Sequence, residues 1–451
     1  MSGFRGASRS GRRWPATAAF SFPPALCLAA LSAADAAAQD SAPALNGGDT
    51  AWMIVATALV LFMTLPGLSL FYGGLVRSKN VLSVLVQCLA TAGVISLLWV
   101  AYGYSLAFTD GGSVQLFLGG TSKCFFRGIT PESLTGTIPE SLFAAYQMTF
   151  AIITPALIVG AFAERMRFAG MLLFSVLWFT FSYLPICHMA WAGEGALFHR
   201  WGVLDFAGGT VVHVNAGIAG LVACLLVGPR HGFPKQTMRP HNLPLAVMGT
   251  GMLWVGWFGF NAGSALAANG TAAMALLVTH LAAAAAATTW MAIELVWHRK
   301  ASALGVATGA VAGLVAITPA SGTAGPLGAI VLGCLSAVIC YWSATSLKHR
   351  FGYDDSLDVF GVHGVGGIVG AVLTGVVAAP AFGGTGIGHD SIASQVGWQA
   401  ASVLVTAAWS GVVSVVAFLL VDRLVGMRAS REVEQMGLDL SEHQEQAYEI
   451  V

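Results

Sequence analysis

Residues 51–74 read AWMIVATALVLFMTLPGLSLFYGG, without a single charged side chain. A helix rises 1.5 Å per residue, so a run of this length crosses the roughly 30 Å of hydrocarbon in a bilayer. Ten further apolar runs follow, at 81–108, 141–163, 169–191, 205–228, 245–266, 271–296, 304–320, 327–347, 358–380 and 398–422. The short alternating segments of a membrane β-barrel are missing. The sequence therefore predicts an all-α polytopic membrane protein with eleven transmembrane helices.

The composition agrees with this fold class. Of the 451 residues, 56% are hydrophobic and only 9% are charged, whereas a soluble domain carries roughly a quarter of its residues as charged ones. Lys+Arg and Asp+Glu are equal at 21 each, so the chain has no basic field that would attract nucleic acid. The seven cysteines include no C-x-x-C spacing. A soluble enzyme, a disordered chain and a nucleic-acid partner are excluded.

The first 38 residues have the features of a secretory signal peptide. Four arginines precede a short apolar core at 24–34, and the alanines at 36–38 form a small-residue cleavage site. That core is too short to span a bilayer. We expect a bacterial protein with a signal peptide at 1–38, an outer N-terminal segment at 39–50, a membrane domain at 51–424 and a C-terminal tail at 425–451.

The positively charged residues predict the orientation. With the N-terminus outside, the inner connections and the tail carry fourteen Lys and Arg residues, and the outer connections carry only Lys123, Arg127 and Arg200. Cytoplasmic loops of membrane proteins are enriched in such residues. We therefore expect a multi-pass protein of the bacterial inner membrane, with a periplasmic N-terminus and a cytoplasmic C-terminus.

Two sequence echoes lie five spans apart. Ile-Thr-Pro-Ala occurs at 153–156 and again at 317–320, and Leu-Asp at 204–205 before His213 is matched by Leu-Asp at 357–358 before His363. Because five is odd, the second copy enters the membrane upside down. The sequence predicts two inverted five-helix repeats plus an eleventh helix, with a conduction site between the repeats.

Few ionisable side chains fall inside the spans, and each is a candidate for function because burying a charge in hydrocarbon costs ~2.5–3.5 kcal/mol or more. They are Asp205, His188, His213, His280, Glu294, Asp358 and His363. Asp205 and Asp358 begin their helices and are expected to cap free N–H groups. Glu294 is expected in a solvated ion pair, and His188 and His280 as hydrogen-bonded interior residues.

His213 and His363 occupy comparable places in the two repeats, so pseudo-symmetry can bring both to one axis. Neither has the neighbouring ligands of a metal site. Two neutral imidazoles can line a pore with alternating donor and acceptor nitrogens, which favours passage of a small polar solute or a proton.

Aromatic residues gather near the outer ends of the spans. Tyr146 and Phe150 are four apart on one helix face, and Trp191, Trp257, Phe260 and Ser264 lie at similar depth. They are either interfacial belt residues or a cation trap, in which aromatic faces attract a cation and a serine oxygen accepts one N–H.

Five strings in this chain resemble those of the ammonium transporter family (Amt/Mep/Rhesus), in its bacterial Amt branch. They are FYGG at 71–74, AER at 163–165, DFAGG at 205–209, GWFGFNAGS at 256–264 and DVFGVHG at 358–364. The resemblance covers roughly 50–451. The resemblance implies a homotrimer without cofactor. It implies an outer ammonium site formed by Trp191, Phe150, Ser264 and Tyr146, and a gate formed by Phe150 and Phe260. It also implies a pore lined by His213 and His363, with structural support from Asp205, Trp257 and Asp358.

The resemblance also implies a mechanism. Ammonium, unlike potassium, can lose its proton, so an apolar pore rejects potassium and passes ammonia along the imidazoles; whether the proton follows separately stays open. Residues 437–448 resemble the family's cytoplasmic tail, with Gln444 where glycine is common. The implied partner of that tail is a PII-type nitrogen regulatory protein.

Three alternatives stand beside uptake. An ammonium sensor on the same fold would be expected to append a large output domain. A potassium channel would need a carbonyl filter resembling Thr-Val-Gly-Tyr-Gly, which is absent from the sequence. A membrane enzyme would need a nucleophile or metal set beside Asp205, so we predict that the chain is not an enzyme.

Overall fold

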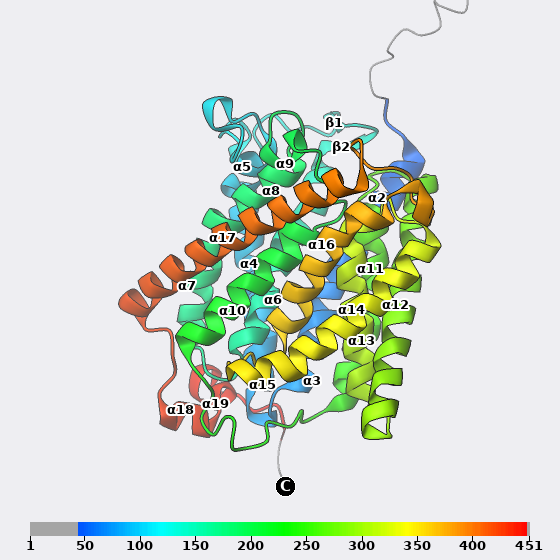
Figure 1. Ribbon diagram of the computed structural model, residues 1–451. Coiled ribbons are helices and arrows are strands. Elements are labelled where there is room, and N and C mark those ends of the chain that lie inside the picture. Colours follow the sequence, from blue (N-terminus) through cyan, green and yellow to red (C-terminus); the bar gives the residue numbers. More distant parts are fainter. Residues whose placement is uncertain (1–43, 449–451) are drawn as a thin grey trace, which may run out of the picture. The chain divides into compact units, whose positions relative to one another are not determined.

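All eleven predicted spans are present in the computed structural model, which describes residues 44–448 (Figure 1). The predicted signal peptide lies outside the described residues. Several spans consist of two consecutive helical segments. In chain order the spans contain α2 (Gly47–Phe62) with α3 (Ser69–Leu75), α4 (Val81–Leu98) with α5 (Tyr104–Phe108), α6 (Glu140–Phe162), α7 (Phe168–Trp178) with α8 (Leu184–Trp191), α10 (Asn215–Val227), α11 (Leu243–Gly263), α12 (Gly270–His298), α13 (Ala303–Ile317), α14 (Pro326–Trp342) with α15 (Lys348–Phe351), α16 (Val365–Val377) and α17 (Ile392–Val425).

The described spans contain six π-helical turns, which the sequence did not indicate. They are η1 (Met63–Leu68), η3 (Trp99–Gly103), η6 (Phe179–Tyr183), η7 (Gly209–Val214), η9 (Ser343–Leu347) and η10 (Phe360–Gly364). A π turn fits one extra residue into a helical turn and re-aims the side chains around it, and such turns are frequent at functional sites. His213 lies in η7 and His363 in η10.

The connections differ at the two ends of the bundle. One end, here called the loop side, carries a long connection with the two-stranded hairpin β1 (Leu134–Thr135) and β2 (Ile138–Pro139), and the short helix α9 (Leu197–Arg200). The opposite end, the tail side, carries α18 (Arg431–Met436) and α19 (Leu438–His443) (Figure 1).

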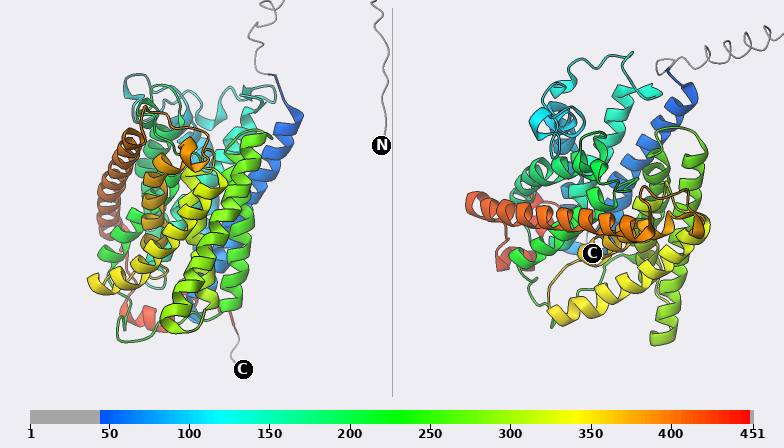
Figure 2. Two further views of the ribbon diagram at one scale, coloured as in Figure 1. Left: turned by 45° about the vertical axis from the view of Figure 1, so that its right-hand side comes forward. Right: turned by 45° about the horizontal axis from the view of Figure 1, so that its top comes forward.

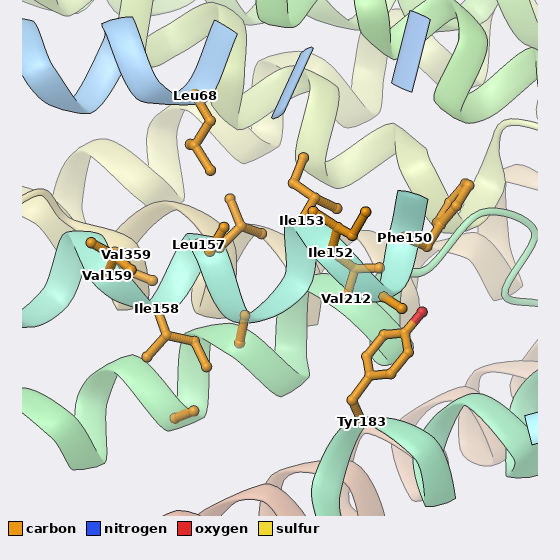
Figure 3. Close-up of a cluster of buried hydrophobic side chains, with 14 of the residues drawn as sticks. Leu68, Phe150, Ile152, Ile153, Leu157, Ile158, Val159, Tyr183, Val212 and Val359 are labelled. Carbon is orange, nitrogen blue, oxygen red and sulfur yellow. The ribbon is translucent and has the colours of Figure 1, made fainter. Parts of the chain in front are cut away.

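The innermost helix is α6, which is buried over nearly its whole length. Figure 3 shows Ile153 and Leu157 of α6 facing Leu68 of η1, with Val212 of η7 nearby. The outermost helix is α17, which runs obliquely across α10 and α16 (Figures 1 and 2). Leu404, Val412 and Leu419 of α17 are exposed, as suits a surface that faces lipid.

Most predicted boundaries lie within three residues of the observed ones. The predicted 141–163 is observed as Glu140–Phe162, but the predicted 398–422 is observed as Ile392–Val425. The oblique α17 is longer because a tilted helix needs more residues to cross the same thickness. At the N-terminal end, α2 already begins at Gly47, with Asn46 as its cap, inside the segment expected to precede the first span.

Reciprocal main-chain contacts join the two halves. Phe206, before η7, donates its N–H to the carbonyl of Pro319 (3.1 Å), which ends the eighth span; Leu357, before η10, donates its N–H to the carbonyl of Gly160 (3.1 Å) in the third span. The segment before η7 therefore contacts the proline-containing eighth span, and the segment before η10 contacts the proline-containing third span of the other half. The prediction of inverted repeats agrees with this arrangement.

The register of the repeat differs from the predicted one. Asp355, not Asp358, is the counterpart of Asp205, because each lies eight residues before its histidine and accepts the N–H five residues further on (Thr210 at 2.8 Å and Phe360 at 2.8 Å). Burial raises the pKa of Asp355 to about 6, against the attraction of Lys348. The expected cap at Asp358 is wrong because, within the described residues, its carboxylate accepts from Lys348 Nζ (2.8 Å) and from no main-chain N–H of η10.

Candidate functional site

Three cavities follow one another between the halves. The loop-side cavity, of about 300 Å³, is lined by Thr135, Phe143, Gln147, Phe150, Trp191, Phe206, Ser264 and Leu266. The middle cavity measures about 10 Å³, which is at the lower limit for one water molecule. The tail-side cavity, of about 440 Å³, shares Phe71, Val311 and His363 with the middle one. The cavities form one interrupted path from end to end.

The loop-side cavity brings three predicted residues together. Phe150 and Trp191 meet edge to face, with ring centroids 5.6 Å apart at 88°. Ser264 follows the last turn of α11, and its hydroxyl donates to the carbonyl of Phe260 (2.9 Å), so its oxygen lone pairs remain available as acceptors. Two aromatic faces and one hydroxyl oxygen suit a small cation that donates hydrogen bonds.

The predicted gate residues separate this cavity from the middle one. The rings of Phe150 and Phe260 lie 4.2 Å apart between centroids, tilted by 30°, and both side chains are buried. Ring contact at this distance leaves no passage, so a solute can pass only when the rings move.

The two histidines meet in the middle cavity. Nδ1 of His363 lies 3.3 Å from Nδ1 of His213, and the rings are 5.4 Å apart at 23°. One Nδ1 must donate and the other accept, so the two neutral rings have opposite tautomers. One Nε2 then carries a proton and the other carries a lone pair. Nε2 of His213 is buried and has no hydrogen-bond partner within residues 44–448.

Trp257 and Asp205 hold this geometry. The Trp257 ring stacks on His213 (5.5 Å, 22°), and its Nε1 donates to Thr318 Oγ1 (2.9 Å). Asp205 accepts main-chain N–H groups of Gly208 (2.9 Å) and Gly209 (2.5 Å) and also bonds the N–H groups at 210 and 211 and the Thr210 hydroxyl. A buried carboxylate thus satisfies the free donors at the start of η7.

Tyr146 stands behind the loop-side cavity. Its ring meets Phe150 edge to face at 5.0 Å, and its hydroxyl lies 2.8 Å from the carbonyl of Phe260 and 3.2 Å from Ser264 Oγ. The hydroxyl therefore contacts α11 and the serine, and Tyr146 does not line the cavity.

A buried ion network adjoins the tail-side cavity through Arg230. Arg77 and Arg230 bind Glu164 at 2.7 and 3.4 Å, and Arg230 also binds Asp354 at 2.8 Å. Burial opposes ionisation of Glu164, but Arg230 and Arg77 outweigh it and hold the pKa of Glu164 below its usual value. Both acids of the network are thus satisfied by arginine.

The tail is docked on the same side. Asp439 accepts the N–H groups of Leu82 (3.0 Å) and Ser83 (2.7 Å) at the start of α4, and Glu434 binds Arg428 (2.6 Å). Gln444 has a φ of 57° and ends α19. The left-handed turn that glycine favours is therefore present with glutamine in its place.

Other candidate residues lie away from the path. The ring nitrogens of His188 lie 2.9 and 2.8 Å from carbonyl oxygens, which agrees with a hydrogen-bonded interior residue. His280 is exposed on α12 against Trp254, so the expected interior position is wrong. Glu294 accepts from Ser302 (2.6 and 2.9 Å) rather than pairing with a cation.

Sequence reasoning missed Gln147 and Phe206, which line the loop-side cavity. Gln147 follows Tyr146 on α6, and its position as an amide inside an apolar span was the available signal. Within the described residues, no group of three or more His, Cys, Asp or Glu side chains could hold a metal ion.

An all-helical bundle of inverted halves, with a narrow path between them, defines a polytopic membrane protein of the transporter or channel class. The Ammonium Transporter Family model matches residues 51–448, and the chain belongs to this family. The membership confirms that the chain is a transport-family protein and not an enzyme.

Relatives agree along almost the whole chain. It is 46% identical to the "Ammonium transporter" of Aquifex aeolicus over 413 residues, covering 90% of this chain and 94% of that one. It is 43% identical to the "Ammonium transporter" of Bacillus subtilis over 407 residues, covering 89% and 98%.

Solved structures share the fold. Saccharomyces cerevisiae Mep2 is 34% identical with a TM-score of 0.76, covering 88% of this chain and 93% of that one. A structure described as "Sensor Amt Protein" is 28% identical with a TM-score of 0.82, covering 88% and 98%.

Proposed function

We propose that this protein takes up ammonium, moving it from the loop side to the tail side across the bacterial inner membrane. The observation that carries the proposal is the series of three cavities with the paired histidines in the middle one. The names of the relatives agree with the substrate.

Ammonium binds first in the loop-side cavity, against the faces of Phe150 and Trp191 with one N–H directed to Ser264. A cation–π contact contributes ~0.5–2 kcal/mol, more as water is removed. That attraction concentrates the ion, but it cannot carry a bare charge through an apolar passage of about 10 Å³. The ion therefore leaves its proton at the gate, and ammonia enters.

Ammonia then passes the histidine pair. Because the two rings have opposite tautomers, they offer one N–H donor and one acceptor lone pair, which replace the hydrogen bonds that ammonia loses with water. The same pair gives the released proton a route to the tail side, so transport carries net charge.

The test is current across proteoliposomes that hold the purified full-length protein. An ammonium pulse should give a transient current without alkalinisation of the lumen, as reported by a dye, because ammonia and its proton both cross; an equal potassium pulse should give no current. Ammonium binding without flux would favour the second candidate, an ammonium sensor, which the likeness to the solved sensor structure supports. A potassium current would contradict both.

We also propose a topology, an oligomeric state and a partner for this protein. Residues 1–38 direct export and are removed, residues 39–50 face the periplasm, the membrane domain spans 51–424, and the tail at 425–451 lies in the cytoplasm. The protein forms homotrimers in the lipid bilayer, and a PII-type nitrogen regulatory protein binds from the cytoplasm. The basic residues at the tail side support this orientation.

We propose further that the tail regulates the path, since it is joined to the connections around the tail-side cavity. Replacing Asp439 by alanine removes the carboxylate that caps two main-chain N–H groups at the start of α4, and loss of such a capping residue typically costs ~1 kcal/mol. We expect faster protease cleavage of the tail and an altered uptake rate. Glu445→Ala, an exposed acid of the same segment, is the matched control; equal cleavage of both variants would contradict docking through Asp439.

A further inference from the structure

The tail-side cavity has a different chemistry from the loop-side one. Arg230, Lys348 and Asp358 are the charged side chains that line it, with His363 where it joins the middle cavity. Arg230 is committed to Asp354 and Glu164. Asp358 is therefore the one carboxylate among the described lining residues, and one third of its side chain is exposed (33%).

The backbone holds Asp358 in a fixed place relative to the pore. Its φ of 58° lies in the left-handed region, which disfavours residues other than glycine, although Asp and Asn tolerate it best. Its carbonyl accepts the N–H of Val362 (2.8 Å), the residue before His363. Strain of this kind persists where the surroundings impose it, often at functional sites.

Lys348 shows what this carboxylate binds. Its Nζ donates to Oδ1 of Asp358 (2.8 Å) and to the carbonyl of Asp355 (2.6 Å). The lysine head group is a tethered ammonium with three N–H donors, chemically the closest side-chain relative of free ammonium. Oδ2 of Asp358 accepts no hydrogen bond from the part of the chain that the structure describes.

We propose that Asp358 is a second ammonium-binding site, at the tail-side mouth of the path, with Lys348 as its tethered competitor. This inference rests on the proposed function. Ammonium binds Oδ2 of Asp358, on the tail side of His363, and competes with Lys348 Nζ for the carboxylate. Because the charge of Lys348 is retained nearby, this site binds the ion more weakly than a carboxylate alone would.

The site makes the two entrances unlike each other. Ions entering from the loop side meet aromatic faces and a hydroxyl, whereas ions entering from the tail side meet a carboxylate. Asp358 therefore sets the apparent affinity for flux that starts at the tail side, and it leaves the loop-side affinity to Phe150, Trp191 and Ser264.

The experiment compares right-side-out with inside-out membrane vesicles that contain the full-length protein, with ammonium as the probe. For Asp358→Asn, which tolerates the same backbone conformation, we expect KM at the tail side to rise about tenfold and KM at the loop side to change less than about twofold. For Lys348→Gln, we expect tail-side KM to fall. Asp422→Asn, an exposed tail-side acid outside the cavity, should change neither.

The outcomes separate the two proposals. Wild-type vesicles without ammonium flux in either orientation overturn the proposed uptake. Wild-type flux with an unchanged tail-side KM in Asp358→Asn overturns the second site alone, as does an equal change in both orientations. If Asp358→Asn fails to insert, Lys348→Gln still decides, since an unchanged or raised tail-side KM contradicts competition for the carboxylate.

Discussion

Replacing Asp205 by alanine is expected to abolish ammonium uptake and to destabilise the protein by at least about 3 kcal/mol. The carboxylate bonds four main-chain N–H groups at the start of η7, and each buried donor left without a partner costs ~1–3 kcal/mol. Trp191 also donates to the Asp205 carbonyl (2.9 Å). Relaxation of this segment would therefore move both the loop-side ring and His213.

The other repeat supplies the control. Asp355 holds the equivalent position but accepts one main-chain N–H, that of Phe360, so Asp355→Ala should cost only ~1–3 kcal/mol and should retain part of the uptake. Thermal unfolding in detergent gives the stabilities, and proteoliposome flux gives the activities. If Asp205→Ala is no less stable than Asp355→Ala, the capping role assigned to Asp205 is wrong.

Replacing His213 by alanine is expected to let potassium through. The imidazole lines the narrow middle cavity, stacked on Trp257 and paired with His363. Without it, the middle cavity gains room for water beside the remaining ring, which lowers the cost of carrying a charge. If that cost falls by about 3 kcal/mol, which is the order of the free-energy cost of placing a charged residue in hydrocarbon, the ratio of potassium to ammonium flux rises roughly a hundredfold.

His280→Ala is the matched control, since His280 is exposed on α12 outside the path. Its currents should equal those of the wild type. Liposome currents under equal ammonium and potassium gradients measure both variants. Unchanged discrimination in His213→Ala, with ammonium flux retained, would falsify the selective role of the pair.

The fold could be predicted because the hydrophobicity and length of each span can be judged from that span alone. An uncharged run such as 51–74 can satisfy its backbone inside a bilayer only as a helix, so the number of spans could be counted without any contact information. Two predicted pairs of residues lie together in the structure: Phe150 contacts Phe260, and His213 contacts His363. Phe260 and His363 lie in distinctive strings, whereas Phe150 was found by its four-residue spacing from Tyr146 and His213 by its position after Leu-Asp at 204–205.

The misassigned acid shows the limit of string matching. Leu-Asp precedes both histidines in the sequence, yet the capping role belongs to Asp355, three residues before Asp358. A short repeated string matches residue types only, whereas a cap is defined by the N–H groups that the carboxylate reaches. Asp358, with its left-handed backbone, instead faces the tail-side cavity and Lys348.

The sequence by itself determined that this chain forms eleven apolar helices in two inverted halves, because hydrophobic length and charge placement act within each span. Only the tertiary structure decided where the π turns fall, which acid caps which helix, and how the tail meets α4, since these depend on atoms of distant segments competing for the same hydrogen-bond donors. The narrow middle cavity likewise exists only when both halves pack together, as its lining comes from six of the spans.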